Sequence, residues 1–139
     1  MRTNIIISVL LTIAALIAAA CGGGEALPDK TIKSTAAGNM TVALASATGE
    51  LKNGENELIL SFSDASGKPV DVGAASLTFH MPAMAAMAEM NDQATLTTTG
   101  AAGKYRAAVN IEVGGTWEAI IKYEGKQGSG EARMTVIAK

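Results

Sequence analysis

A short segment of the sequence carries most of its chemically distinctive side chains. Met81, Met84, Met87 and Met90 follow one another at intervals of three residues, and the only histidine, His80, stands directly before them. Thioether sulfur is a soft, neutral donor that suits Cu(I) or Ag(I), and imidazole suits copper in either oxidation state. Because thioethers release no proton on binding and form no disulfides, the segment predicts a soft-metal site that works without cysteine.

The spacing of three sets a condition on the backbone of this segment. Along a β-strand, Met81 and Met87 point to one face while Met84 and Met90 point to the other. Along an α-helix, the methionine stripe drifts by about 60° per step. Only a conformation with about three residues per turn, a 3₁₀ turn or polyproline II, keeps all four sulfurs on one face. A site that uses all four methionines therefore predicts such a conformation.

The same residues allow two other interpretations. Methionine is a flexible side chain that fills irregular core gaps and forms adaptable binding surfaces. The segment can therefore pack against the fold, or it can contact another protein. A single histidine beside a strand is also commonly a surface residue. Metal binding, packing and protein contact all stay open at this point.

The composition argues against most enzymes and against nucleic-acid binding. Catalytic triads, zinc sites and thiol pairs draw on several His or Cys residues, whereas this chain of 139 residues has one of each. Its 11 basic and 13 acidic residues give a formal net charge of −2, which offers no basic surface for a phosphate backbone. We therefore expect one non-catalytic domain that binds no nucleic acid.

The N-terminus has the pattern of an export signal. Arg2 precedes an uncharged apolar run over 5–20, which is shorter than the roughly 20 residues of a membrane-spanning helix and ends in alanines. Residues 1–20 are therefore predicted to be a signal peptide that is cleaved before Cys21. The junction resembles a bacterial lipobox, in which Cys21 becomes the lipid attachment. Cleavage at the same bond without lipidation is the alternative.

The residues after Cys21 favour a tether. Residues 22–29 are rich in glycine and poor in apolar side chains, as is typical of a flexible linker. We assign 21–37 to a lipid-attached linker and 38–139 to the folded domain. The expected location is the bacterial cell envelope, with the domain anchored to a membrane and facing the periplasm or the exterior.

The rest of the sequence predicts an all-β fold, an antiparallel β-sandwich. Apolar residues alternate with polar or small ones in short runs, which are separated by Gly, Asn, Asp and Pro. Seven candidate strands lie near 40–44, 57–63, 75–79, 95–99, 105–111, 117–123 and 132–136. Trp117, the only tryptophan, is expected to pack between the sheets.

Five motifs together resemble the YtkA-like family, which is related to FixH-like proteins. They are NGENEL at 53–58, GKPV at 67–70, MPAM at 81–84, GKY at 103–105 and GTW at 115–117. The resemblance spans about 38–137 and implies an exported, often lipid-anchored, immunoglobulin-like β-sandwich. Members occur beside or fused to heavy-metal and copper transport components. They often carry Gly-Met after the MPxM motif, where this chain has Ala85, Ala86 and Met87.

These observations predict an exported lipoprotein that binds or delivers Cu(I) or Ag(I). His80, Met81 and Met84 are the first candidate ligands, and Met87 or Met90 completes the set. Its partners would be the membrane, through the lipid, and a metal-transport or envelope protein. The alternative function is a non-catalytic interaction domain that presents the methionine segment to such a partner.

Overall fold

The computed structural model describes residues 26–139, and these form an all-β sandwich. The strands are β1 (Lys30–Ala37), β2 (Met40–Ser46), β3 (Gly54–Asp64), β4 (Ala74–Met81), β5 (Met90–Gln93), β6 (Thr95–Thr98), β7 (Lys104–Ile111), β8 (Gly115–Gly125) and β9 (Gly128–Ala138). The predicted signal peptide and Cys21 lie outside the described residues. None of the residues that the structure describes forms a helix long and apolar enough to cross a membrane.

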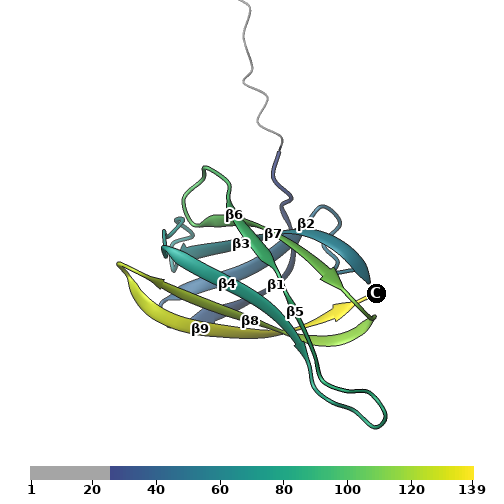
Figure 1. The fold of residues 1–139 in the computed structure, drawn as a ribbon. Coiled ribbons are helices and arrows are strands. Elements are labelled where there is room, and N and C mark those ends of the chain that lie inside the picture. Colours follow the sequence, from purple (N-terminus) through teal and green to yellow (C-terminus); the bar gives the residue numbers. More distant parts are fainter. Residues whose placement is uncertain (1–25) are drawn as a thin grey trace, which may run out of the picture.

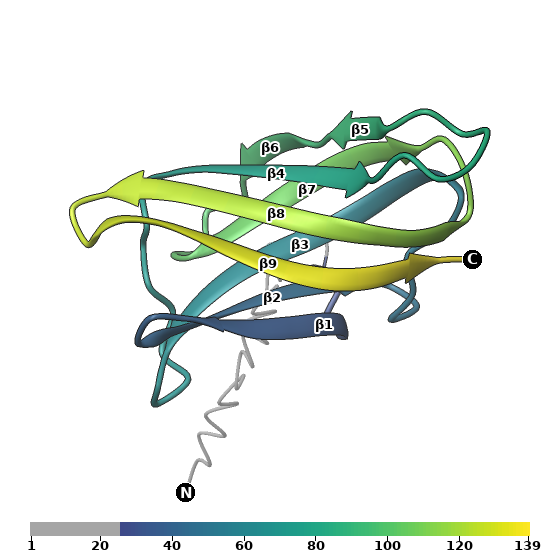
Figure 2. The same cartoon turned by 90° about the horizontal axis from the view of Figure 1, so that it is seen from below.

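The strands form two antiparallel sheets. One sheet has the order β1-β2-β3-β7-β6, and the other has the order β5-β4-β8-β9. Figure 1 and Figure 2 show the two sheets packed face to face. The predicted fold class, an antiparallel β-sandwich, is therefore confirmed.

The core lies between the sheets and follows the period of two that the sequence shows. In β3, Leu58, Leu60 and Phe62 are buried, because alternate side chains of a strand point to the same face. Trp117 in β8 is buried as expected. Its indole N–H donates to the carbonyl of Val113 at 3.0 Å, so the only polar group of this side chain is paired inside the fold.

Each of the seven predicted strands is present, but the described residues contain nine. The two that were not predicted, β1 and β5, are both edge strands. Only Ala37 is buried among the eight residues of β1, and β5 is a short polar strand. The assignment of 21–37 to the linker is therefore wrong in its second half. The sandwich begins at Lys30, where β1 starts to pair with β2.

One residue between β5 and β6 sets the position of the methionine segment. β5 belongs to one sheet and β6 to the other, and Ala94 is the single residue between them. Ala94 is buried, and its N–H donates to the carbonyl of Leu77 in β4 at 2.9 Å. This contact fixes β5 alongside β4. The residues between these two strands therefore form the connection of a β-hairpin.

Candidate functional site

The methionine segment forms the end of the hairpin made by β4 and β5. The last pair of the regular ladder is Met81 with Met90, and beyond it residues 82–89 project from the sandwich (Figure 1). Met84 and Met87 then pair again: each backbone N–H donates to the carbonyl of the other residue, with N···O distances of 3.0 and 2.7 Å. We call residues 84–87 the hairpin tip.

The conformation with three residues per turn, which a site using all four methionines would need, is not present, because the segment is a hairpin. Its four methionines form two cross-strand pairs, Met81 with Met90 and Met84 with Met87. Directly opposed residues on antiparallel strands share a face, with Cβ atoms about 4.5–5.5 Å apart. The backbone therefore brings the thioethers together two at a time.

The tip turns on two alanines. Ala85 has a φ of 45°, which lies in the left-handed region that costs an L-residue about 1–2 kcal/mol. The two hydrogen bonds between Met84 and Met87 close the turn around it. The tip is therefore a defined backbone structure that holds both methionines.

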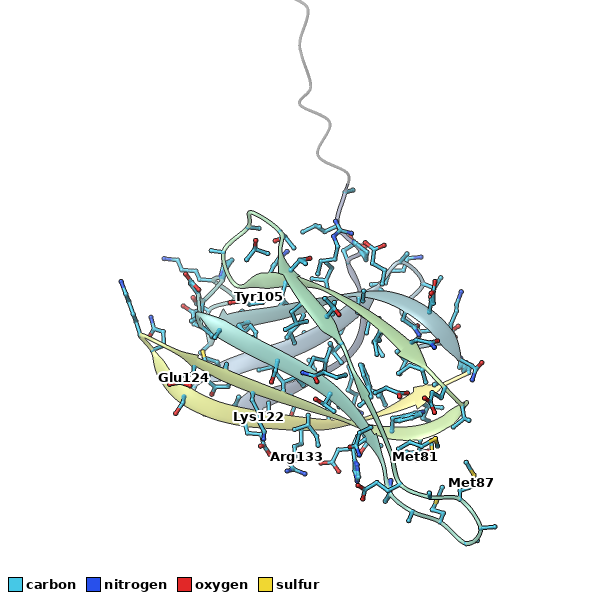
Figure 3. The ribbon with its side chains drawn as sticks, in the orientation of Figure 1. Met81, Met87, Tyr105, Lys122, Glu124 and Arg133 are labelled. Atoms are coloured by element: carbon cyan, nitrogen blue, oxygen red, sulfur yellow. The ribbon has the colours of Figure 1, made fainter. Side chains whose placement is uncertain are left out.

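The two methionine pairs differ strongly in exposure. The side chains of Met84 and Met87 are 52% and 46% exposed, whereas Met81 is 3% exposed. A Cβ added to Gly115 would lie 3.3 Å from the terminal methyl of Met81, which shows that Met81 packs against the start of β8. Met90 is partly buried against the core. Of these two pairs, the tip pair is the one exposed to solvent. Figure 3 shows Met81 at the base of the hairpin and Met87 on its projecting part.

His80 does not join the methionines. It precedes Met81 in β4, so the two side chains lie on opposite faces of the strand. On the outer face, His80 Nδ1 lies 2.9 Å from Oδ1 of Asn91, its cross-strand partner. The Asn91 side-chain amide in turn donates to Glu89 at 3.3 Å. Since an amide oxygen only accepts, Nδ1 carries the hydrogen, and in the neutral ring the Nε2 lone pair faces away from Asn91.

Sequence reasoning missed Asn91 as the partner of His80. An asparagine at position 91 does not by itself indicate a partner for His80. The two residues are found to be opposite each other only when the hairpin register, with Met81 opposite Met90, is known. The structure therefore divides the predicted ligand set. It brings Met84 and Met87 together, buries Met81, leaves Met90 at the base, and turns His80 to the other face.

The outer face beyond His80 is an ion-paired surface. Glu118 is the cross-strand partner of His80 on β8, and it accepts a hydrogen bond from Arg133 at 2.7 Å. Arg133 also donates to Glu131 at 2.5 Å. The contacts with Glu131 and then Glu118 raise the pKa of the Arg133 guanidinium. Oε1 of Glu118 is thus engaged with the Arg133 guanidinium.

The donor types decide which metals this region fits. Among residues 26–139, no group of three or more His, Cys, Asp and Glu side chains is placed to hold a metal ion. Borderline and hard ions such as Zn²⁺ and Ca²⁺ are bound by such groups. Thioethers suit soft monovalent ions instead. Of the metal chemistries considered, the tip pair fits the soft-ion class.

Comparison with known protein families identifies the domain. The family model described as YtkA-like matches residues 34–122, which is more than half of the chain. The chain belongs to the YtkA-like family. The matched residues of this YtkA-like domain include the whole methionine hairpin and end within β8. Searches among curated proteins and among solved structures found no match. The family and the all-β fold both fit a non-catalytic module.

Proposed function

We propose that this YtkA-like protein is an exported lipoprotein that binds Cu(I) or Ag(I) and passes the ion on, and that it has no catalytic activity. One observation carries the proposal. Met84 and Met87 are a cross-strand pair, and both are about half exposed on a projecting tip. Neither residue belongs to the core or packs against it, and a side chain that stays half exposed gains only part of the free energy of full burial, so core packing alone does not account for this pair.

The surroundings of the tip favour a soft ion that is held loosely. Ala83, Ala85, Ala86 and Ala88 flank the two methionines, so no charged group lies beside the sulfurs within 83–88. Neutral thioethers bind without proton release, and an exposed ion can be reached by an incoming ligand from a partner. These properties suit buffering or delivery to a metal-transport or envelope protein.

A competition titration with Cu(I) tests the proposal. Cys21 is replaced by Ser throughout, because a thiolate would bind Cu(I) by itself. The chain from residue 21 onward retains all described strands, which lie within 30–138. We expect this protein to withdraw Cu(I) from a chromogenic chelator. The double variant Met84→Leu/Met87→Leu, which keeps the apolar bulk and removes both donors, should lose this ability.

A matched control separates the site from methionine content. Met40 and Met134 are buried in the core, so Met40→Leu/Met134→Leu removes the same number of sulfurs elsewhere. This variant should compete for Cu(I) like the parent protein. Equal affinity in the tip variant and the core variant contradicts the proposal.

The location is tested separately from the metal. We propose that residues 1–20 direct export and that Cys21 carries the lipid. Labelled palmitate should be incorporated into the protein in bacterial cells, and the protein should fractionate with membranes. Cys21→Ala should lose both properties, and retention of the label in this variant contradicts the assignment.

A second function uses the same tip without metal. Half-exposed methionines are typical of adaptable protein-binding surfaces, so the tip can contact an envelope partner directly. In that case Met84→Leu keeps function and the charged Met84→Asp loses it. Metal binding predicts that both substitutions weaken Cu(I) affinity.

A further inference from the structure

The hairpin tip supplies two thioethers and no further soft donor. Between residues 82 and 89 the other side chains are a proline, four alanines and Glu89. Glu89 carries a hard carboxylate that accepts a hydrogen bond from Asn91. Met81 is buried and His80 lies on the opposite face of β4. Met90 is partly buried against the core, so within residues 26–139 one copy of the chain offers an exposed soft ion two ligands.

Two ligands leave part of the ion's coordination sphere open. Cu(I) and Ag(I) have filled d shells, as Zn²⁺ has, so their geometry is set by ligand number and packing, and four-coordinate tetrahedral sites are common for such ions. Neutral thioethers donate weakly, so additional sulfur donors strengthen binding. The site gains most from a partner that brings two more thioethers.

We propose that a second copy of this chain completes the site, so that one soft ion joins two hairpin tips through Met84 and Met87 of each. This inference rests on the proposed metal binding and names the partner at that same site. It places the ion on a two-fold axis, where identical surfaces meet, as in most homodimers. The interaction is ion-dependent because the tips present little other contact area.

The shape and charge of the tip allow this approach. Residues 82–89 project beyond the sheets (Figure 1, Figure 2), so two tips can meet before the sandwiches collide. The side chains next to Met84 and Met87 are alanine methyl groups, which add no charge and little bulk. The one charged side chain of the segment, Glu89, accepts a hydrogen bond from Asn91 at the base of the hairpin. The two backbone hydrogen bonds between Met84 and Met87 fix the backbone of each tip. Less conformational freedom is therefore lost on association.

Silver titration with mass measurement tests the inference. The Cys21→Ser protein from residue 21 onward is titrated with Ag(I) in chloride-free buffer, and its mass is followed by light scattering after size exclusion. We expect a dimer that is maximal at one ion per two chains. Excess Ag(I) should return the protein to monomer, because each tip then holds its own ion.

The variants and outcomes separate this inference from the proposed function. Met84→Leu/Met87→Leu should stay monomeric at every Ag(I) concentration, and Met40→Leu/Met134→Leu should dimerise like the parent. Binding of one ion per chain without any dimer overturns the bridged site and leaves the proposed function standing. The bridged site is also overturned if Met84→Leu/Met87→Leu forms the dimer. Absence of Ag(I) binding by calorimetry overturns both.

Discussion

His80 and Met81 are adjacent in the sequence but lie on opposite faces of β4. Met81 is buried against the start of β8, whereas the His80 ring contacts Asn91 on the outer face at 2.9 Å. No single ion can be held by both side chains while β4 keeps its pairing with β5 and β8. A ligand set that looks continuous in the sequence is therefore divided by the alternation of one strand.

The first prediction concerns this division. His80→Ala and Met81→Leu should each leave the Cu(I) affinity unchanged in the competition titration, because Met81 is buried against β8 and His80 contacts Asn91 on the outer face. Met81→Leu conserves volume in the core and should lower the free energy of unfolding by less than about 1.5 kcal/mol. A marked loss of affinity in either variant shows that the site extends beyond the tip.

The second prediction concerns the turn at Ala85. Its φ of 45° costs about 1–2 kcal/mol for an L-residue, and Gly adds about 0.4–1 kcal/mol of chain entropy to the unfolded state. Ala85→Gly should therefore raise the local free energy of opening by up to about 1.5 kcal/mol. Exchange of the hydrogen-bonded Met84 and Met87 amides measures this quantity directly.

Ala86 provides the control for this turn. It lies beside Ala85 outside the left-handed region, so glycine there relieves no strain and adds flexibility. Ala86→Gly should lower the local free energy of opening by about 0.5–1 kcal/mol. If both substitutions change the local free energy of opening in the same direction, the result contradicts backbone strain at Ala85.

The third prediction concerns oxidation. Methionine sulfoxide forms where the sulfur is accessible, so limited hydrogen peroxide should add oxygen to Met84 and Met87 first. Met40, Met81 and Met134 are buried and should react slowly. Peptide mass spectrometry gives the order. In urea these five methionines should react at similar rates. Similar rates for all five in the folded protein contradict the burial described.

The fourth prediction concerns the turn after β3. Asp64 Oδ1 accepts hydrogen bonds from the Ser66 hydroxyl at 2.7 Å and from the backbone N–H groups of Ser66 and Lys68 at 2.9 and 3.0 Å. The Ser66 hydroxyl, followed by the Lys68 N–H, lowers the pKa of Asp64 below its ordinary value of 3.8. The charged carboxylate is therefore favoured in the folded state.

The sign of the pH effect follows from this lowered pKa. The stabilisation by Asp64 is complete above the unfolded pKa, near 3.8, and is lost as the pH falls through the lower folded pKa. Urea unfolding measured between pH 5 and pH 2 should show that the free energy of unfolding falls more steeply with decreasing pH in the parent protein than in Asp64→Asn. Ser66→Ala should lie between them. Parallel losses in all three proteins contradict the role of this turn.

The alternation of apolar residues was sufficient to predict the interior strands. Each has a buried face, and burial imposes the period of two that the sequence displays. The edge strands β1 and β5 were missed because they bury little surface, so their sequences carry little of that period. The edge strand β9 was predicted because it does bury alternate residues, and β6 because of its threonines. In β1, five of the eight residues are exposed, and its residues resembled a linker.

The hairpin was missed for a different reason. A two-residue hairpin turn usually contains Gly, Asn or Asp, which accept a positive φ. Here Ala85 takes that conformation, so no residue type marked the turn. The spacing of three between methionines then resembled a helical period. The tip pair Met84 and Met87 becomes visible only when register is known, because pairing across a turn depends on the position of the turn.

The start of β1 at Lys30 also limits where the protein can act. With the lipid that we propose on Cys21, eight residues, 22–29, separate the anchor from the sandwich. An extended chain covers about 3.3–3.6 Å per residue, so the domain stays within about 30 Å of the bilayer surface. Encounters between two copies, or with a recipient in the same membrane, then occur by lateral diffusion in two dimensions, which raises their effective concentration without any change in contact chemistry.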